Sequence, residues 1–176
     1  MKTNGLSVLL FLSTLAISSA APRVISADAL FPVLAKRSGG AVEVRNDSNG
    51  VETLVIRSAK ATPRAWDLQT STSLSEGVAK GEWITVEFAL RGKAAYGDGR
   101  IAVKLQDRAT RALIREEPRS SEAVWKSFRY EAQAAQDYPK GDLTLALFLG
   151  LERQVVEMRG LTISVSRERL ARSQRY

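Results

Sequence analysis

The 176-residue sequence contains neither cysteine nor histidine, and its 26 basic and 19 acidic residues give a formal net charge of +7. The missing cysteines exclude a disulfide framework and a lipid-modified cysteine, and the two absences together exclude zinc hydrolases, cysteine proteases and Ser-His-Asp triads. The positive charge is spread along the chain, apart from a cluster at 167–175, and no nucleic-acid-binding motif accompanies it. Nucleic acid is therefore not an expected partner.

Residues 1–20 have the composition of a removable signal peptide. Lys2 is followed by an apolar run from 6 to 17 and then by three small residues at 18–20. The run is shorter than the roughly 20 residues that cross a bilayer. Cleavage after Ala20 is expected, which predicts a secreted or periplasmic protein that does not span a membrane. An uncleaved N-terminal anchor is the alternative.

The first half of the remaining chain begins with a lead-in, 21–40, that we expect to pack loosely before a Gly-Gly break. Residues 41–45 and 51–59 alternate apolar and polar side chains as strands do. Between them, 46–50 predicts a hairpin turn, because Asn-Gly readily takes positive φ angles. Further strands are predicted at 66–71, 82–91 and 100–107.

The second half closes with two long strands. A turn at 139–142 precedes four leucines in strict alternation at 143–149, and another strand follows at 154–165. An additional strand is predicted at 123–131, with Val124, Phe128 and Tyr130 facing the core. Residues 111–115 fit a strand or a turn, and the tail, 167–176, fits a basic helical turn or a frayed end. Eight or so strands at intervals of about ten residues predict an all-β fold at 41–166, an antiparallel jelly-roll β-sandwich.

Catalysis is not predicted by any motif. Carboxylates such as Glu87, Asp107 and Glu157 could be neighbours on a sheet, but pairs of this kind are common on sheet surfaces. The sequence has no phosphate-binding loop, nucleophile elbow or metal-ligand spacing. We therefore expect a protein that is not an enzyme.

A binding face is better supported by the alternation. The predicted outward side carries an aromatic ring, an amide, a guanidinium and small hydroxyls, which suit the apolar faces and hydroxyls of sugars. The same composition describes the solvated side of an ordinary antiparallel sheet. From alternation alone, the solvated side of an ordinary sheet is the favoured interpretation and a binding face is the alternative. The residues concerned are Thr85, Glu87, Arg91, Lys104, Gln106, Thr144 and Phe148.

The ordered motifs WDLQ at 66–69, KGEWITVEFALRG at 80–92 and the segment 124–164 resemble carbohydrate-binding modules of families 4 and 9. The variant associated with family 10 xylanase-like domains is the most similar. The resemblance covers roughly residues 41–165 and includes no catalytic domain, so we expect a stand-alone secreted domain. The matching positions are Trp66, Gln69, Gly81, Phe88, Arg91, Trp125, Phe128, Tyr138, Gly141, Leu149, Gly150, Gln154, Glu157 and Gly160.

The resemblance implies a jelly roll that often holds a structural calcium ion, no other cofactor, and a groove on a concave sheet that binds β-linked glucan or xylan. Phe148 stands where the family frequently has histidine, and Ala89 where it often has an aromatic residue. Both lie on the predicted outward face. The residues expected to contact the polysaccharide or oligosaccharide are Phe148, Arg91, Gln106, Gln69 and Trp66.

The sequence is compatible with three functions. The first is a non-catalytic carbohydrate-binding module that uses aromatic stacking and hydrogen bonds. The alternative is a jelly-roll domain that holds a protein partner or a cell-envelope component, and an esterase or lyase on the same fold is third. Among single residues, Gln154 is expected to be a buried amide and Arg91 to pair with Glu87. Trp83, Trp125 and Tyr138 are expected to serve in packing.

Overall fold

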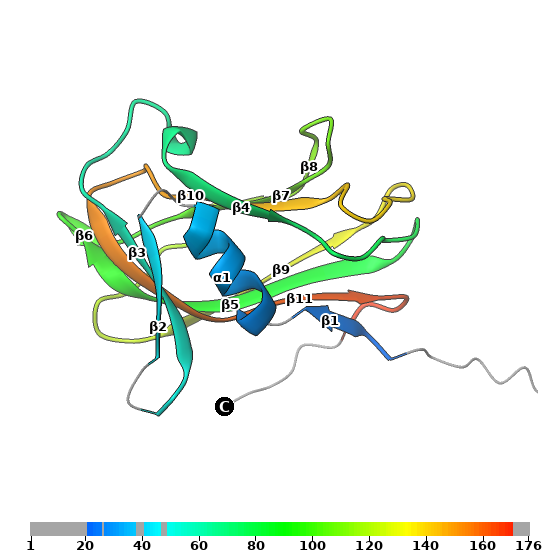
Figure 1. Cartoon of the computed structure of the whole chain (residues 1–176), viewed down its shortest axis with the longest axis horizontal. Coiled ribbons are helices and arrows are strands. Elements are labelled where there is room, and N and C mark those ends of the chain that lie inside the picture. The colour runs from blue at the N-terminus through cyan, green and yellow to red at the C-terminus, as the bar shows by residue number, and fades with distance from the viewer. Residues whose placement is uncertain (1–20, 26, 38–40, 47–48, 171–176) are drawn as a thin grey trace, which may run out of the picture.

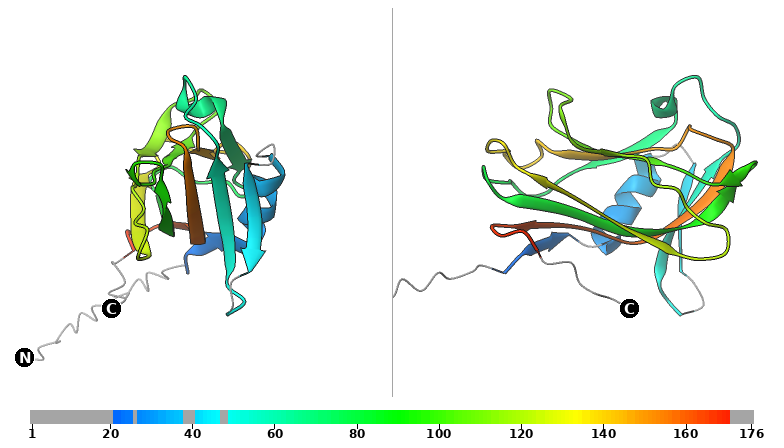
Figure 2. Two further views of the ribbon diagram at one scale, coloured as in Figure 1. Left: turned by 90° about the vertical axis from the view of Figure 1, so that its left-hand side faces the viewer. Right: turned by 180° about the vertical axis from the view of Figure 1, so that it is seen from behind.

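A computed structural model describes residues 21–25, 27–37, 41–46 and 49–170. The predicted signal peptide, the Gly-Gly break and the end of the basic tail lie outside these ranges. The described chain is an antiparallel β-sandwich of two sheets, as the sequence predicted (Figures 1 and 2). Within these ranges, no helix has the length and apolar character needed to cross a membrane.

The larger sheet has seven strands. Its main order is β2-β3-β11-β5-β6, while β1 also pairs with β11 and β9 with β5. Every pairing is antiparallel. The strands are β1 (Arg23–Ile25), β2 (Val42–Asn46), β3 (Glu52–Ser58), β5 (Trp83–Ala94), β6 (Gly97–Asp98), β9 (Lys126–Gln133) and β11 (Gln154–Ser166).

The smaller sheet has four strands in the order β4-β10-β7-β8. The chain passes back and forth between the sheets, so neighbours within a sheet are mostly distant in sequence, as in a jelly roll. Figure 2 shows the two sheets as two layers, and one apolar core lies between them. The strands are β4 (Gln69–Ser73), β7 (Ala102–Gln106), β8 (Ala112–Glu116) and β10 (Thr144–Phe148).

The closing segment behaves as its alternation predicts. The four leucines at 143, 145, 147 and 149 are all buried, and Gly141 takes φ 78° in the turn before them. In β11 the inward positions change parity between Met158 and Leu161. A register shift between Arg159 and Thr162, with Gly160 at φ 61°, absorbs the extra residue as a β-bulge. Both halves of β11 therefore keep their apolar side chains in the core.

The prediction of a loosely packed lead-in is wrong. Strand β1 joins β11, and residues 27–37 form the helix α1 (Ala27–Arg37), whose Leu30, Phe31 and Leu34 are buried in the core. Figure 1 shows α1 across the opening between the sheets, where it packs against β4 and β2. The hydroxyl of Thr70 on β4 donates to the Leu34 carbonyl. Pro32 within the helix obscured its periodicity, because proline usually ends a helix.

Two smaller predictions also need correction. Trp66 does not belong to a strand: residues 65–67 form the short 3₁₀ helix η1 (Ala65–Asp67), and β4 begins only at Gln69. Val124 does not face the core, because it lies in the loop before β9 and is 57% exposed. The open alternative at 111–115 is decided in favour of a strand, β8.

Candidate functional site

The five residues predicted to contact a ligand do not share one face. Gln69, Gln106 and Phe148 lie on the outward side of the four-stranded sheet, on β4, β7 and β10. Trp66 lies in η1, which contacts β10. Arg91 lies on β5 of the other sheet and points away from the core, as do the alternate residues of that strand. A single groove containing all five is therefore not formed.

The face of the four-stranded sheet keeps its predicted polar character. Phe148 is partly buried between Gln69 and Ala102 on the neighbouring strands. Gln106 is opposite Thr144, four residues from Phe148, which is about 13 Å along a strand. Ligand contact by this group, and by Trp66 at 53% exposure, stays a prediction.

A pocket of about 360 Å³ opens on the outward face of the seven-stranded sheet. Its floor is a cross-strand row in which Arg91 on β5 is opposite Glu157 on β11 and Glu157 is opposite Val55 on β3. The β2–β3 hairpin contributes one wall. Its lining residues are Arg45, Asn46, Asn49, Thr53, Val55, Arg91, Trp125, Glu157 and Arg159.

Trp125 is the aromatic residue of this pocket. It directly precedes β9, whose first residue, Lys126, is opposite Leu90, so Trp125 lies beside Arg91. The guanidinium carbons of Arg91 and Arg159 lie 4.8 and 4.2 Å from its ring centroid, within the range of cation–π contacts. Packing was predicted for Trp125, but its contacts are with cations on the outward face. Its place in the alternation, opposite to Phe128, could have indicated this.

Arg91 does form an ion pair, but not with the predicted partner. Its Nη2 and Nε donate to Glu157 Oε2 at 2.6 and 3.0 Å. Glu87 Oε1 instead accepts a hydrogen bond from Nη1 of Arg129 at 3.2 Å. Residues directly opposite on adjacent antiparallel strands have Cβ atoms only about 5 Å apart, whereas four residues along one strand span about 13 Å. The cross-strand carboxylate therefore takes the place of the one on the same strand.

The other end of this sheet face is covered by residues 167–170. The guanidinium of Arg169 lies 5.1 Å from the ring centroid of Trp83, and Arg129 Nη2 donates to the Leu170 carbonyl at 2.7 Å. Thr85 and Ser164 point outward in the alternation of β5 and β11, yet they are only 1% and 6% exposed. Residues 167–170 thus cover one end of this sheet face. They do not cover the other end, which contains the pocket lined by Trp125 (the Trp125 pocket).

Beneath this segment, Glu131 is held by two arginines. Arg129 Nη2 and Arg169 Nε donate to it at 2.6 and 2.8 Å. Burial by itself would raise the pKa of Glu131, but the hydrogen bonds and charges of the two guanidinium groups lower its pKa below the ordinary value. A carboxyl group with a lowered folded-state pKa stabilises the fold above its ordinary pKa, about 4.3, and this contribution disappears as the pH falls through the folded-state pKa.

We therefore expect the stability difference between the unmodified protein and Glu131→Gln to shrink as the pH is lowered from about 6 to about 3. Urea unfolding across this interval measures the difference. In Arg169→Gln, the contribution of Glu131 should be smaller and should be lost completely at a higher pH, because one of the two cations that lower its folded-state pKa is gone. A difference that stays constant with pH would contradict the inferred role of Glu131.

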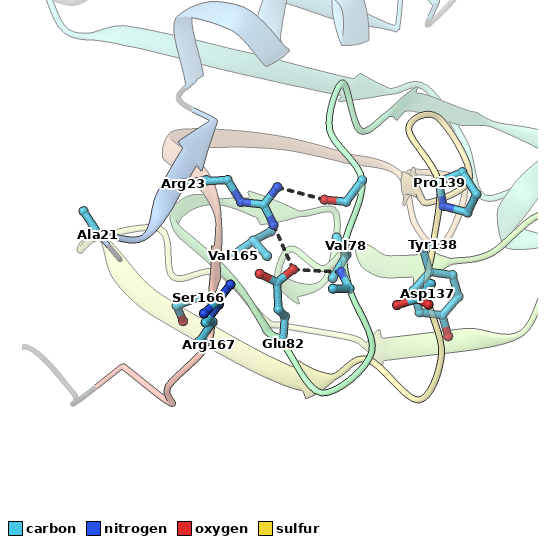
Figure 3. Close-up of a pocket in the computed structure, with 12 residues that line it drawn as sticks. Ala21, Arg23, Val78, Glu82, Asp137, Tyr138, Pro139, Val165, Ser166 and Arg167 are labelled. Carbon is cyan, nitrogen blue, oxygen red and sulfur yellow. Dashed lines mark hydrogen bonds and ion pairs between the residues drawn. The ribbon is translucent and has the colours of Figure 1, made fainter. Parts of the chain in front are cut away.

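A second pocket, of about 560 Å³, lies beside β1 and the turns near residues 78 and 138. Several of its polar groups bind one another (Figure 3). Arg23 donates to Glu82 at 2.8 Å and to the Gly77 carbonyl at 3.0 Å, and the same Glu82 oxygen accepts the Ala79 amide at 2.8 Å. These contacts attach β1 to the adjacent turn. We therefore interpret this pocket as a structural junction between β1 and that turn.

For the residues that the structure describes, the calcium ion that the resemblance implied stays a prediction. These residues contain no group of three or more acidic, histidine or cysteine side chains that could hold a metal ion. The buried carboxylate of Asp107 already accepts the backbone amide of Arg111 at 2.9 Å and its Nε at 2.7 Å.

The expected structural role of Gln154 is confirmed. Its side chain is buried, its Oε1 accepts the Arg100 amide at 2.7 Å, and its Nε2 donates to the Arg100 carbonyl at 2.6 Å. The Leu149 carbonyl also accepts from Nε2, at 3.3 Å. A buried amide is stable when its donors and acceptor are paired in this way.

No known protein-family model matches this sequence, and no curated protein matches it. Solved structures do share its fold. A CBM4 structure has a TM-score of 0.55 at 17% identity, covering 74% of this chain and 80% of its own. The CBM22-1 xylan-binding domain of Xyn10C from Paenibacillus barcinonensis has a TM-score of 0.51 at 16% identity, covering 73% and 82%. The N-terminal cellulose-binding domain of β-1,4-glucanase C from Cellulomonas fimi has a TM-score of 0.51 at 11% identity, covering 76% and 88%. The chain therefore has the fold of carbohydrate-binding modules.

Proposed function

We propose that this β-sandwich, whose fold is that of carbohydrate-binding modules, is a secreted, non-catalytic domain that binds a polysaccharide or oligosaccharide in the Trp125 pocket. The observation that carries the proposal is the pocket itself. It combines an indole ring with guanidinium, carboxylate, amide and hydroxyl groups on a part of the sheet face that residues 167–170 do not cover. The composition of residues 1–20 supports export.

The pocket has the chemistry that a sugar chain requires. The part of the indole surface that the guanidinium groups of Arg91 and Arg159 do not cover offers an apolar contact to the C–H groups of a pyranose ring, while the surrounding polar groups can pair with its hydroxyls. Arg91 and Glu157 hold each other in place, so their remaining donor and acceptor sites are already oriented before a ligand arrives. Asn46 and Thr53 add an amide and a hydroxyl at the hairpin wall.

Replacing Trp125 by alanine should weaken glycan binding at least about tenfold, or about 1.4 kcal/mol, because truncation of a buried aromatic anchor commonly costs that much or more. Affinity electrophoresis against β-glucan, xylan and acidic polysaccharides identifies a ligand, and calorimetry with the matching oligosaccharide measures the loss. Trp125→Phe keeps an aromatic ring and should keep a larger part of the affinity.

Trp66→Ala is the matched control, since Trp66 is also partly exposed and also contacts an arginine, Arg64, at 5.7 Å. It should bind as the unmodified protein does. A loss in Trp66→Ala or Phe148→Ala, with Trp125→Ala unaffected, would move the site to the residues first predicted on and beside the four-stranded sheet. No retention on any polysaccharide would contradict the proposal as a whole.

A further inference from the structure

The Trp125 pocket carries more positive than negative charge. Of the charged residues that line it, three are arginines and one is a glutamate, a formal excess of two positive charges. Arg91 is paired with Glu157, and Arg45 contacts Glu43 at 2.6 Å beside the pocket. Arg159 differs from both, because its guanidinium has no carboxylate partner within the part of the chain that the structure describes.

Arg159 lines the pocket beside the row of Arg91, Glu157 and Val55. It is on β11, opposite Thr53 of β3 on one side and Ala89 of β5 on the other. Ala89 is in turn opposite Ser127 of β9. Because both of these side chains are small, the Arg159 side chain can extend across them, and its guanidinium carbon reaches 4.2 Å from the Trp125 ring centroid. An aromatic side chain at position 89 would offer a second stacking ring, whereas the small Ala89 leaves space for the guanidinium of Arg159 to approach Trp125.

The indole contact leaves a specific chemistry available. A guanidinium that lies over a ring can keep the N–H groups that point away from the ring for other partners. Two parallel N–H groups match the two oxygens of a carboxylate or of a sulfate, and such charge-assisted bonds are stronger than those to neutral hydroxyls. A partly buried cation without a carboxylate partner therefore favours an anionic group in the pocket.

We propose that the pocket binds a glycan that carries negative charge, a uronic acid carboxylate or a sulfate ester, and that Arg159 is the residue that binds the anionic group. This inference rests on the proposed glycan-binding function. The sugar ring contacts Trp125, and Arg159 donates to the anion beside it. Selectivity for acidic over neutral chains follows, because a neutral ligand leaves the Arg159 guanidinium without an anionic partner.

The test compares size-matched oligosaccharides by calorimetry at about 0.15 M salt, where long-range attraction is largely screened. The probes are oligogalacturonate, a sulfated oligosaccharide and neutral xylo- and cello-oligosaccharides. At least one acidic probe should bind about tenfold or more tightly than the neutral ones. Tighter binding of oligogalacturonate assigns a carboxylate as the ligand group, and tighter binding of the sulfated probe assigns a sulfate.

Arg159→Gln should remove about tenfold or more of the affinity for the preferred acidic probe, while affinity for neutral probes changes little. Arg159→Lys keeps the charge without the planar pair of donors and should retain an intermediate affinity. Arg115→Gln is the charge-matched control. Arg115 is exposed on the outward side of β8, opposite Lys104 of β7. Both residues belong to the four-stranded sheet and not to the sheet that carries the pocket, so this variant should bind as the unmodified protein does.

The outcomes separate the two proposals. Equal binding of neutral and acidic probes, with loss in Trp125→Ala but not in Arg159→Gln, overturns the anionic selectivity and leaves the glycan-binding function intact. Equal losses in Arg159→Gln and Arg115→Gln also overturn it, because the effect is then one of net charge. If no probe binds under any condition, the proposed function fails and this inference fails with it.

Discussion

Replacing Phe31 by alanine should lower the free energy of unfolding by about 3–5 kcal/mol, the range measured for truncating a buried aromatic side chain. Phe31 is 0% exposed and belongs to the main core cluster, although it comes from the segment that the sequence predicted to be loose. The helix α1 that carries it covers the opening between the sheets at β2 and β4 (Figure 1). Urea unfolding monitored by tryptophan fluorescence measures the loss.

Val33 provides the control within the same helix. It is 36% exposed, so Val33→Ala removes little buried surface and places a better helix former in α1. Its unfolding free energy should stay within about 0.5 kcal/mol of the original value. If Phe31→Ala were as mild as Val33→Ala, α1 would not belong to the cooperative core.

Gly92→Ala should be similarly severe, with a cost of about 2–6 kcal/mol. Gly92 lies in β5 at φ 136°, and a Cβ there would lie 2.3 Å from the Val155 carbonyl oxygen and 2.7 Å from the Val156 Cα. Both obstacles are backbone atoms of the adjacent strand, so no side-chain rotation relieves the clash. The estimate combines about 1–3 kcal/mol for the backbone conformation with about 1–3 kcal/mol for the overpacking.

Gly81 separates these two contributions. It also has positive φ, 86°, but no atom lies within 4 Å of the position that a Cβ would take. Gly81→Ala should therefore cost only the conformational part, about 1–2 kcal/mol. Thermal or urea unfolding of the two variants gives the comparison. Equal losses at both positions would show that the contact between β5 and β11 at Gly92 is not as close as inferred.

Much of the fold could be predicted from the chain alone. Strands such as β5 and β10 alternate strictly, so their inward side chains were identified correctly, and the bulge at Gly160 does not disturb the pattern on either side of it. Helix α1 was not predicted, because Pro32 interrupts its short apolar pattern. Its apolar face is also buried only by packing into the opening between the two sheets, which the sequence does not show. Its stability comes from tertiary packing more than from local preference.

For the candidate site, the sequence determined which side chains point away from the core but not which strands lie next to one another. Alternation shows that Arg91 and Phe148 both point away from the core, because successive side chains of a strand lie on opposite faces. Alternation does not show that β5 and β10 belong to different sheets. Because they do, Arg91 and Phe148 face opposite sides of the sandwich. That assignment, and with it the meeting of Trp125, Arg91 and Arg159, depends on pairings between strands far apart in the chain. Only the tertiary structure decides these pairings, since they are set by how the whole core packs.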